Sequence, residues 1–426
     1  MRIPKDVILI WTGQNSNIPS GWSRETSLDD KFPKAWGSQN PNQTGGSLTH
    51  SHTTQPHSHN LSNHTHSYTL NPDPNTSYGG VWGGGESIRD GHTHTGTSGN
   101  VIGGTTSSDS FTTGESSNLP PYYEVIFIKA GNSSILSEGI IALWGDNNPP
   151  SDWQICNGSN GSPDLRNKYL KGAASGANAG GTGGSYYNVH SLNHSHTPTS
   201  HYHATSTSNQ SSDARAGSGG SYEWAVPYWH THQVSFGSST QDINSFTGNY
   251  NTSEIVEPAY KKLLAIQFKT GAIKRKGIIG LWLGDINHIP KGWVLCDGNN
   301  GTLDLRDKFI KIANDVNEVG QVGGNNTHSH ANFSHSHSGN SGHSHSASSD
   351  AHQNHSSQIQ AGNASSQHRT LQRNYHSSVS VNSVIANYDN SNIVFNSADN
   401  QPPYRTVAYI QFQKEIYGGS ALLNFL

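Results

Sequence analysis

The chain has 426 residues, enough for two to four domains of ordinary size, but hydrophobic residues make up only 31% of it and charged residues 13%. The formal net charge of -4 excludes a basic surface that would attract nucleic acid or anionic membrane. No apolar stretch approaches the length of a membrane span, and residues 1–13 lack the long apolar core of a signal peptide. Apolar burial alone can therefore order only parts of this chain.

Three copies of one unit follow each other along the sequence, and we predict one domain for each: 1–135, 136–274 and 275–426, the last with a C-terminal tail. Each copy begins with a short apolar strand that ends in a tryptophan, followed after a turn by a second tryptophan. These pairs are Trp11 and Trp22, Trp144 and Trp153, and Trp282 and Trp293. We interpret the first tryptophan of each pair as an anchor of a small hydrophobic core.

Each copy also ends with a Pro/Tyr strand that is rich in β-branched and aromatic residues, at 120–129, 257–269 and 401–414. Helical periodicity is hard to find anywhere in the chain. The two ends of a copy are expected to form a β head. The fold class is therefore mostly β.

Between the two ends of each copy, a Gly-Gly step leads into a polar insert of roughly 70 to 90 residues, which is long for an irregular loop. Such an insert must leave the head and return to it, as a long hairpin or needle. Turn residues at 71–75 and 214–220 are candidates for the far tips.

The inserts carry His-x-His pairs, which account for 20 of the 26 histidines. In an extended strand, both imidazoles of such a pair point to the same side and form a two-nitrogen clamp. The regular spacing argues against a disordered, low-complexity metal scavenger. The predicted metal ligands are His50, His52, His57, His59, His64, His66, His92, His94, His194, His196, His201, His203, His230, His232, His328, His330, His335, His337, His343 and His345.

Alignment of the inserts predicts two levels with a full set of three pairs. One begins at His57, His194 and His335, and the next at His64, His201 and His343. Two further levels have incomplete sets. His50/His52 matches His328/His330, with only His190 near in copy two, and His92/His94 matches His230/His232, with His368 or His376 as the completing residue. A spacing of seven places successive pairs on opposite faces of a flat strand, so the inserts must twist or bulge.

The pattern resembles the bacteriophage tail collar family and the tips of phage tail fibres. The resemblance rests on G-I-I-x-x-W, P-x-G-W-x-x-C-D/N-G and D-L-R-x-K-F/Y, best seen over 277–309, and on PPYxxxxxI over 402–410. It implies collar-like β heads in a trimeric tail appendage. It also implies a needle in which six histidines from three intertwined strands hold iron octahedrally along an axis. The localisation implied is the virion tail, outside the cell.

That family builds homotrimers with one head per chain, whereas three heads follow each other here. We therefore expect a single-chain pseudo-threefold trimer with a metal-stapled needle, and the rival assembly is a true homotrimer. Six imidazole nitrogens favour iron or nickel over zinc, which prefers four ligands, and the resemblance favours iron. A closed six-ligand shell leaves no open position for catalysis.

We find no motif of an enzyme. Asp164 and Asp304 each precede an arginine by two residues, Arg166 and Arg306, which reads as a structural ion pair. The expected role is a structural or receptor-binding protein that contacts other tail proteins and a host-surface receptor. The rival roles are a cell-encoded extracellular filament subunit or adhesin, and a metal-storage protein. Aromatic residues near the tips are candidates for contact with a receptor such as a carbohydrate: Tyr78, Trp82, Trp224, Tyr228 and Trp229.

The two cysteines, Cys156 and Cys296, occupy matching places in copies two and three. Each is expected to pack as a small buried thiol within its own head. A disulfide between them is the less favoured alternative.

Overall fold

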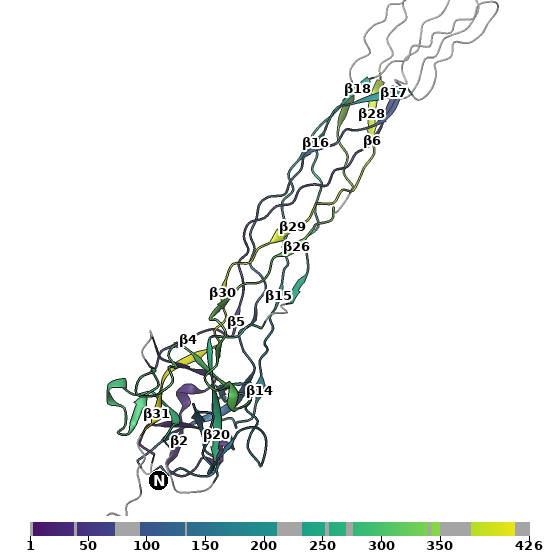
Figure 1. Ribbon diagram of the computed structural model, residues 1–426. Coiled ribbons are helices and arrows are strands. Elements are labelled where there is room, and N and C mark those ends of the chain that lie inside the picture. Colours follow the sequence, from purple (N-terminus) through teal and green to yellow (C-terminus); the bar gives the residue numbers. More distant parts are fainter. Residues whose placement is uncertain are drawn as a thin grey trace, which may run out of the picture.

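Strands dominate the computed structural model, which describes residues 3–37, 41–72, 94–132, 134–210, 232–251, 255–269, 276–339, 342–349 and 376–413. The described helices are short 3-10 turns, so the prediction of a mostly β fold is confirmed. No described helix is long and apolar enough to cross a membrane. The molecule has a rounded head at one end and a long, narrow arm (Figure 1). We define the arm as the described residues of 47–118, 185–256 and 325–400.

Each copy contributes one long strand to the head, and this strand pairs with the first strand of its own copy. The long strands are β10 (Tyr122–Ala130), β20 (Tyr260–Phe268) and β31 (Tyr404–Phe412). Their antiparallel partners are β1 (Ile8–Trp11), β11 (Ile141–Trp144) and β21 (Ile278–Trp282). The last three strands also pair with one another, so that the three copies meet at their apolar first strands. These strands are buried on both faces, as expected of continuous apolar runs.

The long strand of each copy also takes a parallel partner from the next copy. β10 pairs with β13 (Tyr169–Gly172) of copy two, and β20 pairs with β23 (Phe309–Ile312) of copy three. The ring closes because β31 of copy three pairs with β3 (Phe32–Ala35) of copy one. No copy therefore completes its head alone.

The Gly-Gly steps lie where the chain passes from the head into the arm. Each first glycine ends a short strand that pairs with the long strand of the preceding copy, in β4 (Thr44–Gly45), β14 (Thr182–Gly183) and β24 (Val322–Gly323). Each second glycine has a positive φ; for Gly184 it is 79°. A Cβ on Gly184 would lie 2.1 Å from the carbonyl oxygen of Pro120. Only glycine fits both the backbone conformation and the close approach.

Replacing Gly184 with alanine is expected to destabilise the head by more than the positive φ alone explains. The φ of an L-residue there costs about 1–2 kcal/mol, and the forced approach to Pro120 adds about 1–3 kcal/mol. Gly161→Ala is the matched control, because its φ is 78° and nothing lies within 4 Å of its added Cβ. Urea unfolding of both variants measures the difference, and equal losses of stability would contradict the argument.

The three equivalent lysines of the parallel strands have different partners, each supplied by the neighbouring copy. They are Lys311 with Glu257 at 2.7 Å, Lys171 with Glu124 at 3.0 Å and with Asp30 at 3.2 Å, and Lys34 with the Gln401 side chain at 2.7 Å. A buried lysine ammonium needs an ionic or hydrogen-bonding partner, because burying its charge without one is costly. The three copies are therefore not interchangeable within the ring.

Several smaller predictions for the head are confirmed. Trp144 and Trp282 are buried in the core, whereas Trp11 packs partly buried against it. Cys156 and Cys296 are free, buried thiols. The predicted aspartate–arginine pairs form within their own turns, with 2.8 Å contacts between Asp164 and Arg166 and between Asp304 and Arg306. The Arg306 guanidinium lowers the pKa of Asp304 to about 2.

The arm consists of three outgoing and three returning segments that exchange partners along its length. Near the head, each outgoing segment pairs with its own return, in β5–β9 (Thr49–His50 with Ser116–Ser117), β15–β19 (Val189–Ser191 with Asn249–Asn251) and β25–β30 (Thr327–His328 with Ala398–Asp399). Farther out, β16 (His201–His203) of copy two pairs with β8 (Val101–Gly103) of copy one. Short strands alternate with isolated bridges, so successive histidine pairs can face inward despite their odd spacing.

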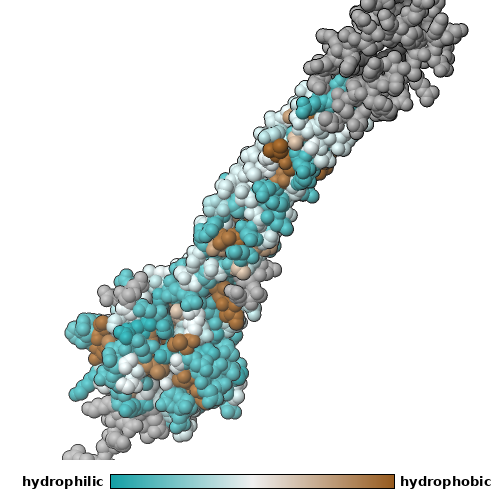
Figure 2. Space-filling view, turned by 45° about the horizontal axis from the view of Figure 1, so that its top comes forward, coloured by the Kyte–Doolittle hydropathy of each residue, from teal (hydrophilic) through white to brown (hydrophobic). Residues whose placement is uncertain are grey.

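At the outer end of the described arm, six strands form one sheet. Its order is β27 (Ala347–Ser349), β18 (His232–Phe236), β17 (Ser206–Gln210), β7 (His94–Thr97), β6 (Ser67–Pro72) and β28 (His376–Val381). The two end strands, β27 and β28, also contact each other. The sheet therefore wraps into a tube. The visible outer face of the arm is mainly hydrophilic or neutral, with scattered hydrophobic residues (Figure 2).

Candidate metal centre

Histidines from all three copies gather in three layers inside the arm. The base tier is His50, His52, His190, His328 and His330. The middle tier is His57, His59, His194, His196, His335 and His337, and the outer tier is His64, His66, His201, His203, His343 and His345. His64, His194 and His328 are half-buried and the others are buried. In each tier, groups of imidazole nitrogens lie within 4.8 Å of one another.

The rings of the middle tier are arranged as the vertices of an octahedron. Every ring lies 4.7 to 5.5 Å from each other ring of the tier except one. The pairs without such contact are His57 and His337, His59 and His194, and His196 and His335. In an octahedron, each vertex likewise faces one opposite vertex and is adjacent to all the others.

The outer tier repeats this arrangement, with ring separations of 4.8 to 5.5 Å. Its opposite pairs are His64 and His345, His66 and His201, and His203 and His343. The first histidine of each copy thus faces the second histidine of another. Two tiers share one geometry although they lie at different points of the chain, which indicates that the arrangement follows from the threefold repetition.

Backbone carbonyls fix the ring orientation of the second histidine in most pairs. The Nδ1 atoms of His52, His59 and His66 lie 2.7 to 2.8 Å from the carbonyl oxygens of Asn396, Asp389 and Asn382, all on the returning segment of copy three. In the same way, the Nδ1 atoms of His190, His196 and His203 in copy two face backbone carbonyls on the returning segment of copy one. Those of His337 and His345 in copy three face carbonyls on the returning segment of copy two. An Nδ1–H that donates to a carbonyl leaves Nε2 as the free ligand atom.

The Nε2 atoms then face one another across the inside of each tier. Those of His59, His66, His203 and His337 are buried and have no hydrogen-bond partner. His64 donates from Nδ1 to Ser62 and His343 donates from Nδ1 to Gln241, yet their Nε2 atoms are 3.2 Å apart. Two lone pairs at this distance repel unless a cation lies between them. The buried donor set therefore fits a metal ion.

Distances within the tiers agree with six-coordination. A bond of about 2.1 Å from a metal to imidazole nitrogen puts adjacent ligand atoms of an octahedron about 3.0 Å apart. Adjacent Nε2 atoms are 3.0 Å apart for His194 and His335 and also for His201 and His343, and 3.3 Å apart for His57 and His196. Small inward movements are enough to form such a shell.

Apolar layers separate the tiers. Between the base and middle tiers, Leu192 and Ile393 are buried among partly buried aromatic rings. Between the middle and outer tiers lie Leu61, Ala386 and Tyr388. A further apolar cluster around Tyr68 and Leu70 covers the outer tier. The middle and outer tiers are thus each bordered by apolar side chains on both sides.

This environment favours neutral imidazole, which is the form that binds metal. Burial, followed by the neighbouring imidazoles, lowers the pKa of His201 and His335 from an ordinary 6.5 to about 3 and that of His57 to about 4. These three histidines are therefore uncharged ligands throughout the neutral pH range.

Lowering the pH from 7 to 4 is expected to release the metal and disorder the arm of the metal-loaded chain. An unfolded histidine takes up a proton near pH 6.5, whereas His57 takes one up only near pH 4, so the unfolded state binds more protons between these values. The contribution to stability is complete above pH 6.5 and falls as the pH decreases toward 4, by about 1.4 kcal/mol per pH unit for each such histidine. Hydrogen exchange of arm amides measures the loss. Protection that stays constant or rises on acidification would contradict the prediction.

The structure describes only part of the fourth predicted level. His94 and His232 are buried, with ring centroids 4.9 Å apart. His376 begins β28 and pairs with Pro72 through the backbone. The remaining histidines of this level, His92, His230 and His368, lie outside the described residues. The predicted tip at 214–220 also lies outside them, as do the aromatic residues Tyr78, Trp82, Trp224, Tyr228 and Trp229. The predicted tip at 71–75 begins within β6, which ends at Pro72.

The base tier contains two residues that the search for His-x-His did not count as ligands. His190 supplies the fifth imidazole, and Asn188 is buried beside it with its Nδ2 atom 3.4 Å from His328 Nε2. A signal was available in the sequence. His50, Asn188 and His328 each stand four residues after the second glycine of their Gly-Gly step, so Asn-x-His replaces His-x-His in copy two.

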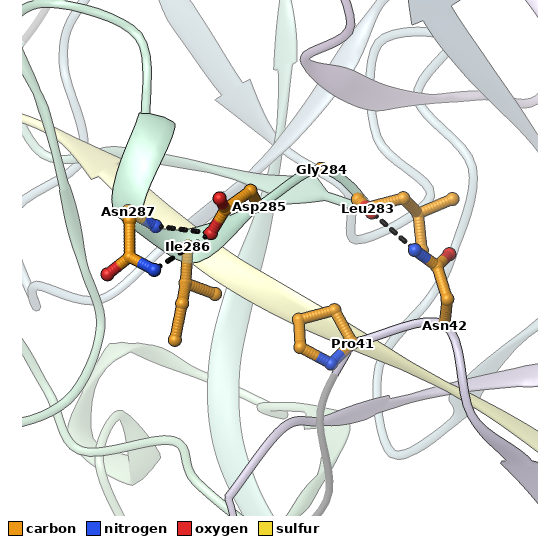
Figure 3. Close-up of a pocket in the computed structure, with 7 residues that line it drawn as sticks. All are labelled: Pro41, Asn42, Leu283, Gly284, Asp285, Ile286 and Asn287. Carbon is orange, nitrogen blue, oxygen red and sulfur yellow. Dashed lines mark hydrogen bonds between the residues drawn. The ribbon is translucent and has the colours of Figure 1, made fainter.

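A depression in the head between copies one and three has a volume of about 380 Å³ (Figure 3). It is lined by Pro41, Asn42, Leu283, Gly284, Asp285, Ile286 and Asn287. Asp285 accepts hydrogen bonds from the backbone and side-chain nitrogens of Asn287, and it is the sole titratable residue of this lining. Asp285 also lies 2.8 Å from Nδ1 of His288, an exposed residue that is not part of the lining.

No protein-family model, curated protein or solved structure matches this chain.

Proposed function

We propose that this chain is a non-enzymatic virion protein of a bacteriophage tail appendage, a receptor-binding or structural component whose arm is a metal-stapled β needle on collar-like heads. The observation that carries the proposal is the pair of six-histidine tiers built from all three copies. Ions held along the axis of an arm stabilise a long, narrow and polar projection, which a tail tip requires. The head and strand motifs that resemble the tail collar family support the same assignment.

The metal acts as a staple in this proposal. The residues that would hold it are the six histidines of the middle tier, the six of the outer tier and the histidines of the base tier. A six-nitrogen shell suits iron or nickel better than zinc, and iron is our assignment. Because the shell is closed, the ion supplies binding free energy to the arm and offers no position for substrate. This free energy offsets the entropy of ordering segments with little apolar content.

A single-chain pseudo-threefold trimer is the assembly that we propose. The cyclic strand exchange in the head completes each unit within one chain. The unequal partners of Lys34, Lys171 and Lys311 support this assembly, because identical subunits of a homotrimer would not need them. The tip or the heads would then contact a host-surface receptor, with carbohydrate as a candidate class, and neighbouring tail proteins.

Native mass and metal content, measured on one purified sample, test the assembly and the staple together. A monomer of 45.9 kDa with at least two tightly held irons supports the proposal. A trimeric mass would contradict the single-chain assembly and support a homotrimer, as in the tail fibres that the sequence resembles. Metal-free protein with a fully ordered arm would refute the proposal that metal stabilises the arm.

Binding to bacterial cells tests the biological role. Labelled protein is expected to bind saturably to cells of a susceptible strain and to lose this binding when the arm is stripped of metal. Assembly into filaments through the heads, without cell binding, would favour the rival role of a cell-encoded extracellular filament subunit. Sedimentation at increasing protein concentration distinguishes the two.

A further inference from the structure

The base tier is an octahedron with one imidazole missing. His52 lies 4.4 to 5.1 Å from each of the other four rings. Those four, His50, His190, His330 and His328, are adjacent in a closed circuit at 4.7 to 5.0 Å. His52 is therefore the apex of a square pyramid, and the empty vertex lies opposite it.

The complete tiers identify the residue that belongs at this vertex. In the middle tier, the second histidine of copy one, His59, faces the first histidine of copy two, His194. In the outer tier, His66 faces His201 in the same way. The residue opposite His52 must accordingly be the first residue of the copy-two pair, which is Asn188.

The position of Asn188 agrees with this assignment. The side chain is only 4% exposed, and its amide nitrogen lies 3.4 Å from His328 Nε2. Adjacent Nε2 atoms in the tiers are 3.0 to 3.3 Å apart, so the amide reaches the place of a sixth ligand atom. Rotation by 180° about the last side-chain bond exchanges the amide nitrogen and oxygen. The oxygen then takes the place of the nitrogen beside His328 Nε2.

We infer that the base tier is a divalent transition-metal site with five imidazole nitrogens and the amide oxygen of Asn188 as its sixth ligand. This inference rests on the proposed metal needle and goes beyond it, because it assigns one tier a different donor set. The Nε2 atoms of His190 and His330 are buried without a hydrogen-bond partner, as expected for the remaining ligands. The His190 ring is held by the Gly114 carbonyl, 2.8 Å from Nδ1.

An amide oxygen is a harder and weaker ligand than imidazole for iron or nickel. The base tier should therefore release its ion before the two complete tiers do. Among the three described tiers, the base would then hold one exchangeable ion, and the middle and outer tiers would each retain theirs. Only the metal occupancy of the base tier would then change with the supply of metal.

The test is the rate at which a chelator removes iron from the intact, loaded protein, followed by elemental analysis. We expect one ion to leave at least about tenfold faster than those of the middle and outer tiers. In Asn188→His the fast phase should slow by about tenfold or more, and His194→Asn should add a second fast phase. Val189→Ala is the control, because Val189 lies between Asn188 and His190 but is 52% exposed. It should leave every phase unchanged.

Mössbauer spectra of protein loaded with ⁵⁷Fe give an independent readout, since one component should change in Asn188→His and come to match the six-histidine component. A single release rate that Asn188→His does not alter would overturn the inference while leaving the needle intact. A base tier that holds no ion until Asn188 is replaced by histidine would also overturn it. Failure of every variant to bind iron would instead refute the proposed metal needle.

Discussion

Removal of metal is expected to unfold the arm while the head stays folded. The head has a large apolar core made from strands of all three copies. The arm has only small apolar clusters between its tiers. Structural metal sites contribute on the order of 10 kcal/mol each, more than such clusters can replace. Limited proteolysis after chelation should therefore cut within 47–118, 185–256 and 325–400 and spare the long strands β10, β20 and β31.

The control is the same incubation with a chelator that has been saturated with metal beforehand. It should leave the arm resistant, because only free chelator withdraws ions. Restoring iron to the stripped protein should restore the resistance. If elemental analysis shows complete removal and the cleavage pattern is unchanged, hydrogen bonding and apolar contacts hold the arm without metal, and the staple is refuted.

The strands of the head could be predicted because their residues carry local signals. The apolar first strands and the Pro/Tyr closing strands lie at the predicted places and are buried as strands. The exchange of β3, β13 and β23 between copies could not be predicted. A strand such as Phe32–Ala35 has the same composition whichever copy it joins, and its partner β31 lies far away in the sequence. The choice depends on tertiary contacts such as those of the three lysines.

The candidate site could be predicted where its pattern was complete. Spacing alone brought together the right histidines for the middle and outer tiers, although copy three has one more residue than the others between His335 and His343. The base tier was missed in part, because one position holds asparagine and a search for two histidines passes over it. The backbone carbonyls that orient the rings come from returning segments of another copy, and nothing in the sequence marks a carbonyl for this role.

Replacing His201 and His203 together with alanine is expected to remove one ion per chain and to disorder only the outer part of the arm. The outer tier would keep His64, His66, His343 and His345, two imidazoles short of an octahedron. His203 also donates a hydrogen bond from Nδ1 to the Gly99 carbonyl oxygen, 2.9 Å away, and this bond would be lost. Loss of the ion withdraws on the order of 10 kcal/mol from this part of the arm.

Tyr202→Ala is the matched control, because Tyr202 stands between the two histidines on the same strand but points outward and is 49% exposed. It should keep the full metal content. Elemental analysis with hydrogen exchange along the arm distinguishes the outcomes. Because apolar residues Leu61, Ala386 and Tyr388 separate the outer tier from the middle one, the middle and base tiers should keep their ions and their protection. Simultaneous loss of every ion would show that the tiers bind as one cooperative unit, and retention of all ions would show that the outer tier is not a metal site.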